Sequence, residues 1–199
     1  MAIVWNEARA RYRDTTTGKF VSRATVIERL KESLATSSDA IKTLTSSYSS
    51  GSLGKREFST VFRQEIKDEF IRQYVTGRGG VPSMSQKDWG RVGQLLKVQY
   101  QYAAGFERDL GNLSEAQIAA RARLYVNASG AAYEYGKLAA VIASGNFTEE
   151  FWQLGDAEHC ADCESLNSQG WVKIGTLGTV PRAGATECLV NCQCEIRYR

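Results

Sequence analysis

Residues that could hold a metal ion are concentrated near the end of the chain, between positions 159 and 199. They are His159, Cys160, Cys163, Cys188, Cys192 and Cys194. Zinc prefers four tetrahedral thiolate or imidazole ligands, and the two-residue gap of a Cys-x-x-Cys pair lets both sulfurs face one ion. The spacing therefore predicts a structural zinc site in which Cys160 and Cys163 act with two of the last three cysteines. His159 is kept in reserve because it directly neighbours Cys160.

Other uses of these cysteines are also chemically reasonable. Disulfides between the two groups would fasten the same segment, but five is an odd number, which favours free thiols and metal binding in a reducing compartment. A redox centre would place its Cys-x-x-Cys at a helix N-terminus within alternating strands and helices, a pattern the sequence lacks. Catalytic zinc is disfavoured because the chain has a single histidine. Structural zinc and disulfides stay open as alternatives, as does the choice of four ligands.

Positive charge is concentrated at the N-terminus. The first 31 residues carry seven basic and three acidic side chains, a net charge of +4, whereas the whole chain has +3. Candidate contacts to nucleic acid or to an acidic protein surface are Arg9, Arg11, Arg13 and Lys19. A basic segment of this kind suits phosphates, although an ordinary solvated surface would have the same composition.

Apolar periodicity predicts a mainly α fold with four amphipathic helices between residues 22 and 146. Ser22, Ser85 and Ser114 are the expected N-caps of the first, third and fourth helices, and Gly77–Gly80 is the expected end of the second. Short polar connections make a four-helix bundle-like core the expected arrangement. Gly130 weakens the fourth helix, as does a second glycine six residues later, so that a bend or break is anticipated there.

Beyond residue 146 the pattern becomes strand-like, at 151–154, 171–174 and 194–198. A β-rich segment of this size buries little apolar surface by itself, so it needs a metal, disulfides or packing on the bundle. We therefore predict a basic arm (1–21), a helical domain (22–146) and a small β-rich cysteine module (147–199). No stretch is apolar enough to cross a membrane, and the first residues contain no signal-like apolar region.

Three segments of the cysteine module together carry a family resemblance. They are 151–154 with its Trp152, 159–170 with its Cys-x-x-Cys, and 191–196 with Asn191-Cys192-Gln193-Cys194. This pattern resembles the C-terminal signature of the phage minor head, or head morphogenesis, proteins similar to the F protein of phage Mu. Leu189 stands where that family usually has a histidine, and Cys188 is the candidate replacement.

The resemblance implies a non-enzymatic minor virion protein of a bacteriophage, acting in head morphogenesis and capsid assembly. Its expected partners are the portal and/or the major capsid protein, near the inner capsid surface, with packaged double-stranded DNA as a further contact. The protein would be present in several copies in the virion, without membrane contact, after assembly in the cytoplasm of the bacterial host. The alternative is a small zinc-stapled DNA-binding protein, whose basic N-terminal residues would contact phosphates.

Overall fold

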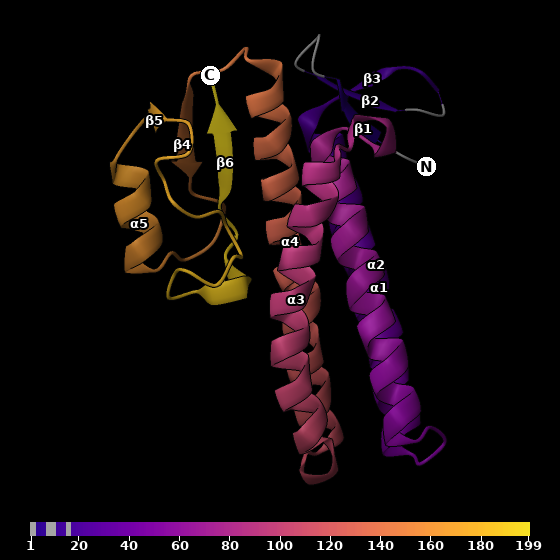
Figure 1. Ribbon diagram of the computed structural model, residues 1–199. Helices are drawn as coiled ribbons and strands as arrows, with labels where there is room; N and C mark the ends of the chain where they lie inside the picture. The colour runs from indigo at the N-terminus through magenta and orange to yellow at the C-terminus, as the bar shows by residue number, and fades with distance from the viewer. Residues whose placement is uncertain (1–2, 7–10, 15–16) are drawn as a thin grey trace.

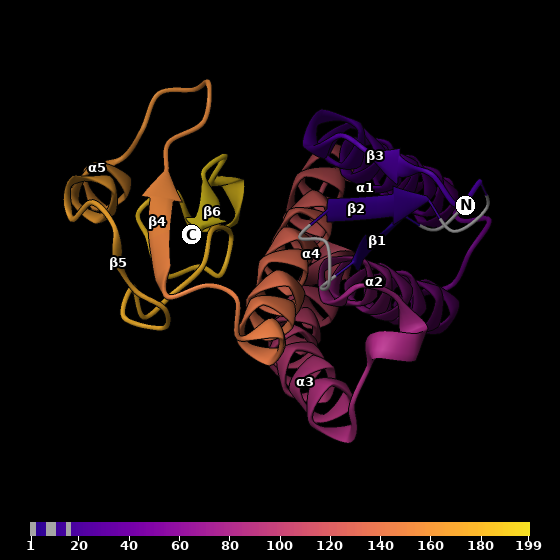
Figure 2. The same cartoon turned by 90° about the horizontal axis from the view of Figure 1, so that it is seen from above.

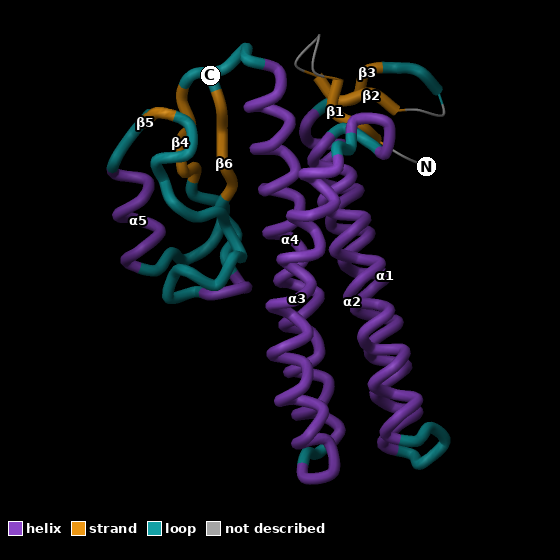
Figure 3. Tube along the Cα trace, in the orientation of Figure 1, coloured by secondary structure: helices purple, strands orange, loops and turns teal. Residues whose placement is uncertain are grey.

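Four long helices form the body of the protein, so the predicted mainly α, bundle-like fold is confirmed (Figures 1 and 3). The computed structural model describes residues 3–6, 11–14 and 17–199. The helices are α1 (Arg23–Ser49), α2 (Lys55–Arg78), α3 (Gln86–Asp109) and α4 (Glu115–Ser144). Short 3-10 turns, η2 (Val81–Ser83) and η3 (Leu110–Asn112), lie in the connections on either side of α3.

The ends of these helices follow the capping chemistry of the sequence. The Ser22 side chain accepts a hydrogen bond from the backbone N–H of Thr25 at the start of α1. Ser85 and Ser114 each form a capping box, in which the cap side chain and the third helical side chain bond each other's backbone N–H. Gly79 ends α2 with a left-handed φ of 101°, a conformation that glycine adopts at low cost.

The bundle core is aromatic where α2, α3 and α4 meet. Phe62 lies against Phe106 and Tyr125 with ring centroids 5.3 and 5.1 Å away, both edge to face. α1 adds Ile41 and Leu44 to the same cluster of buried side chains. The side chains of Val26, Ile27 and Leu30, which belong to the predicted apolar face of α1, lie outside the described part of the chain.

α2 and α4 share the largest interface of the fold, and two glycines permit their close approach. A Cβ on Gly77 would collide with the backbone of α4 at Tyr133, and one on Gly136 would collide with the backbone of α2 at Tyr74. α4 runs without interruption through both of its internal glycines, so the anticipated break does not occur. The α2 backbone occupies the space that a side chain at position 136 would need.

A buried carboxylate fastens the start of α3 to α2. Asp88 accepts hydrogen bonds from the Tyr74 hydroxyl at 2.9 Å and from the Arg78 guanidinium at 3.2 Å, in addition to its capping role at Ser85. These donors hold the pKa of Asp88 below its ordinary value, although burial acts in the opposite direction. The turn between the two helices is therefore fixed by polar contacts as well as by packing.

The N-terminal segment contains a small antiparallel sheet that the sequence did not predict. It has the order β1 (Ile3–Asn6), β2 (Arg11–Asp14), β3 (Phe20–Val21). The sheet lies at one end of the bundle, where β1 contacts α2 and β2 contacts α1 (Figure 1). The segment we predicted as an arm is thus attached to the helices.

The C-terminal module is a second small sheet with one helix beside it. Its strands β4 (Glu149–Gln153), β5 (Val172–Lys173) and β6 (Glu195–Tyr198) pair antiparallel in the order β5-β4-β6. The helix α5 (Ala161–Ser168) follows β4, and the 3-10 turn η4 (Leu189–Asn191) precedes β6. Strands lie near the three predicted places, whereas α5 was not predicted. The module has its own cluster of buried side chains, among them Trp152 and three of the cysteines.

The module packs on α4, on the side away from the N-terminal sheet (Figures 1 and 2). Lys137 of α4 donates a buried hydrogen bond to the carbonyl of Ile196 in β6. The Arg182 side chain lies against Gly130, where a Cβ would collide with its guanidinium, and its Nε donates to the Cys192 carbonyl at 2.9 Å. A flexible side chain, rather than another helix, therefore uses the space above Gly130.

Candidate metal centre

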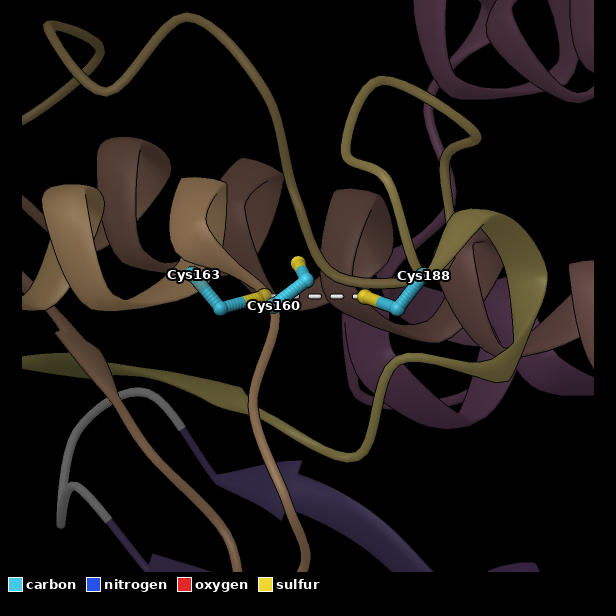
Figure 4. Close-up of side chains that lie close together, drawn as sticks. All are labelled: Cys160, Cys163 and Cys188. Carbon is cyan, nitrogen blue, oxygen red and sulfur yellow. Dashed lines mark hydrogen bonds between the residues drawn. The ribbon is translucent and has the colours of Figure 1, made fainter.

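The first pair of cysteines is positioned by the start of α5. Cys160 is the N-cap residue with an extended backbone (φ −78°, ψ 159°), and Cys163 lies in the first turn with 1% of its surface exposed. A helical turn places residues three apart on one face, so both sulfurs lie on the side that faces the rest of the module. Figure 4 shows the two side chains close together, with the Cys163 sulfur directed toward that of Cys188, which comes from a distant segment.

The second group comes from the loop that leads into β6. Cys188 precedes η4, Cys192 follows it, and Cys194 comes directly before the strand. Cys192 and Cys194 are buried, and Cys188 is half-buried. All five candidate cysteines, from which four ligands were expected, are therefore brought together by α5, η4 and β6.

Sulfur-to-sulfur distances distinguish a metal cluster from disulfides. The Cys163 Sγ lies 3.6 Å from the Cys188 Sγ and 3.6 Å from the Cys192 Sγ. A disulfide requires about 2.05 Å. Two thiolates bound to one tetrahedral zinc at about 2.3 Å are separated by roughly 3.8 Å. All five thiols are free in the described part of the chain, and their spacing suits a shared metal ion better than a covalent bond.

The sulfurs form two overlapping groups. Cys160, Cys163 and Cys188 lie within 4.8 Å of one another, as do Cys163, Cys192 and Cys194. Cys163 belongs to both groups. Each triad offers three of the four ligands that a tetrahedral ion needs. The cluster can therefore hold a metal, with Cys163 at its centre.

The surroundings of the thiols raise the pKa of some and lower the pKa of others. Hydrogen bonding with Cys192, followed by smaller contributions that include Trp152 and the backbone of Gly155, lowers the pKa of Cys194 to about 5. The pKa of Cys163 is raised because the thiol is buried, and that of Cys192 is raised chiefly by its interaction with Cys194. At neutral pH Cys194 is thus ready as a thiolate, the form that binds metal.

N–H groups around the sulfurs are placed to stabilise thiolates of the kind that bind metal. The backbone amide of Cys163 is the main cause of a lowered pKa at Cys160. The indole nitrogen of Trp152 is fully buried, and its interaction with the Cys194 sulfur is one of the causes of the lowered pKa of that thiol. N–H groups of this kind orient metal ligands and stabilise their negative charge. The residues present therefore fit a metal ion.

Comparisons with known proteins give no further identification. No family model, curated protein or solved structure matches this chain. No helix in the described part of the chain is both long and apolar enough to cross a membrane. The geometry of the cysteine module is thus the main structural information about function.

The two predicted basic contact residues whose side chains are described, Arg13 and Lys19, lie apart from the cysteines. Arg13 is in β2 and Lys19 lies in the connection just before β3. The N-terminal sheet is on the other side of α4 from the module (Figure 2). The Arg13 Nε donates to the Gly18 carbonyl at 2.9 Å, so that part of its side chain closes the turn before β3, while Lys19 is exposed. Arg11 is in β2 but its side chain lies outside the described part, and Arg9 lies outside the described residues altogether.

Sequence reasoning missed two further potential ligands and underrated a third. Asp162 and Glu187 lie within 4.8 Å of the Cys160 sulfur, and the Glu187 backbone N–H bonds an Asp162 carboxylate oxygen at 2.8 Å. His159, predicted only as a reserve ligand, has its Nδ1 at 3.8 Å from the Cys194 Sγ. Neighbouring residues in extended backbone point to opposite sides, so His159 and Cys160 can serve different parts of the cluster. This alternation was the feature of the sequence that could have indicated His159 as a ligand.

Proposed function

We propose that this chain is a non-enzymatic minor head protein of a bacteriophage, acting in head morphogenesis with a zinc-stapled C-terminal module. The observation that carries the proposal is the convergence of the resembling segments. Trp152, the Cys-x-x-Cys pair and the closing Cys192 and Cys194 come from three separate segments and share one small buried core. Residues that resemble one family's signature thus build one structural unit in this protein.

The departure from that family's pattern also has a structural explanation. Leu189, which occupies the position of the family's usual histidine, is 54% exposed with a φ of 50°. Cys188 instead contributes the sulfur that lies 3.6 Å from Cys163. This supports the proposal that Cys188 replaces the missing histidine as a ligand.

The position of the cluster supports a structural rather than a catalytic metal. Structural zinc sites have four protein ligands, whereas catalytic sites keep one position for water or substrate. Cys163, Cys192 and Cys194 are buried within the module, among apolar side chains such as Ile196. Zinc at this place would supply the stability that the small sheet cannot obtain from its own apolar area.

The proposed partners follow from the virion role. The portal and/or the major capsid protein would contact the helical body near the inner capsid surface, with several copies in each particle, after assembly in the host cytoplasm. Packaged double-stranded DNA would be contacted through Arg9, Arg11, Arg13 and Lys19. Four such phosphate contacts predict that log K for duplex DNA falls against log salt with a slope of about −3.6.

The decisive experiment is the composition of purified particles from the phage that encodes the chain. Quantitative mass spectrometry should find the protein in proheads and mature virions at a fixed number of copies per particle. A Cys163→Ser phage should assemble fewer complete heads, whereas Ser165→Ala, an exposed change on the same helix, should assemble them normally. Absence of the protein from both kinds of particle would refute the structural role.

A further inference from the structure

The cluster contains more donors than one tetrahedral ion can use. Five thiols and one imidazole are available, whereas a single zinc takes four ligands. Among the described residues, the potential ligand atoms that lie within 4.8 Å of one another form triads, and no set of four is found. Cys163 connects the two sulfur triads through its contacts of 3.6 Å to Cys188 and to Cys192.

One sulfur of the triad Cys160, Cys163 and Cys188, that of Cys160, has a carboxylate beside it. Asp162 lies in the first turn of α5, and it forms a group with Cys160 and Glu187 in which all ligand atoms are within 4.8 Å. The hydrogen bond from the Glu187 N–H at 2.8 Å fixes the Asp162 side chain against the loop that carries Cys188. A ligating carboxylate is commonly held in this way by a second hydrogen bond.

One sulfur of the triad Cys163, Cys192 and Cys194, that of Cys194, has an imidazole beside it. The His159 Nε2 is 3.0 Å from the Gly155 carbonyl oxygen, which can only accept, so in the neutral ring Nε2 carries the hydrogen and donates a hydrogen bond to that oxygen. Nδ1 then bears the free lone pair, and it lies 3.8 Å from the Cys194 Sγ. Sulfur and nitrogen ligands on one tetrahedral zinc are separated by roughly 3.6 Å, so the position suits a shared ion.

We propose that the module holds two zinc ions bridged by the Cys163 thiolate. One ion is bound by Cys160, Cys163, Cys188 and Asp162, and the other by Cys163, Cys192, Cys194 and His159. Two tetrahedral ions require eight ligand positions, of which the bridging sulfur fills two and the other six donors fill one each. The inference deepens the proposed zinc staple and depends on it.

Metal stoichiometry separates this inference from the staple itself. The full chain is purified under reducing conditions, loaded with zinc, freed of excess metal and measured by elemental analysis against amino-acid analysis. Two zinc ions per chain are expected. One ion would overturn the second site and leave the staple in place, whereas no bound zinc would overturn both.

Single substitutions then test the assigned ligands. His159→Asn should reduce the content from two ions to one, while the circular dichroism of the bundle stays unchanged. Glu158→Gln, at an exposed neighbouring position, should keep both ions. Two retained ions in His159→Asn would overturn the role of the imidazole.

The bridge is tested without a substitution that could unfold the module. Replacing zinc with the nuclear spin-½ isotope ¹¹³Cd in the wild-type chain should give two resonances that are split by coupling through the shared sulfur. Two resonances without mutual coupling would overturn the bridging role of Cys163. A single resonance would overturn the second ion.

Discussion

The glycine at position 136 should resist replacement even by alanine. A Cβ there would lie well under 3.0 Å from the Tyr74 carbonyl oxygen and 3.0 Å from the Arg78 nitrogen, both of them backbone atoms of α2. The backbones would have to separate by roughly 1 Å to restore normal van der Waals contact. α2 and α4 carry the main core of the bundle between them, so this displacement would loosen the packing along both helices.

Two opposing effects determine how much Gly136→Ala changes the free energy of unfolding. Overpacking in a close-packed interior costs about 1–3 kcal/mol. Alanine in place of glycine inside a helix stabilises that helix by about 1 kcal/mol. We expect Gly136→Ala to lower the free energy of unfolding by about 1–2 kcal/mol, because the colliding atoms belong to the backbone and cannot rotate away. For a chain of this length, that corresponds to a Tm lower by about 2–8 °C.

Gly93→Ala provides a control with the opposite sign. Gly93 lies inside α3, is exposed, and a Cβ there meets nothing within 4 Å. Its replacement should raise the free energy of unfolding by about 0.5–1 kcal/mol. Both variants are measured by thermal and urea unfolding, followed by circular dichroism at equal metal content. If Gly136→Ala raises the Tm as Gly93→Ala does, the close backbone contact between α2 and α4 is incorrect.

Three further predictions follow from contacts of the module and the core. Lys137→Met removes the buried donor to the Ile196 carbonyl and should lower the stability of the module by about 1–3 kcal/mol. Amide hydrogen exchange in β6 should become faster in this variant, whereas Lys173→Met, an exposed change in β5, should leave that exchange unchanged. Burial raises the pKa of Tyr125 to about 12 from 10.0, so the hydroxyl in the unfolded state loses its proton first and the free energy of unfolding falls between pH 10 and 12. Urea unfolding of Tyr125→Phe should show a smaller fall over this range. A pH profile identical to that of the wild type would contradict this cause. A chelator should shift the fluorescence of buried Trp152 to longer wavelength while the circular dichroism of the helices persists, because the module and the bundle have separate cores. Loss of the helical circular dichroism together with the fluorescence shift would contradict that separation.

The sequence predicted the long helices well because their signals are local. Ser85 and Ser114 have their capping partners three residues away, and Gly79 ends α2 by its own conformation. α5 was missed because its eight residues, Ala161–Ser168, bury only Cys163 and therefore show no apolar stripe. The N-terminal sheet was missed because strands of two to four residues carry little periodic pattern.

The candidate metal centre was predictable in its members but not in its arrangement. Clustering of soft donors in one segment indicated that the five cysteines would meet. Their division into two triads depends on the path of the chain between Cys163 and Cys188, which local patterns do not specify. Asp162 was overlooked because an acidic residue in the first turn of a helix is ordinary, since it also stabilises the helix dipole.

The separation of the two buried cores has a consequence for the order in which the protein can mature. The buried residues of the bundle core lie between Ile41 and Ala132, whereas those of the module core lie between Trp152 and Ile196. During synthesis the ribosome releases the bundle sequence before it has made the second group of cysteines. With a metal ion as the proposed staple, chains made without that ion would have a folded body and an unformed tail. The module can therefore form only after the bundle has left the ribosome, and binding of the metal ion would be the last step in the maturation of the chain.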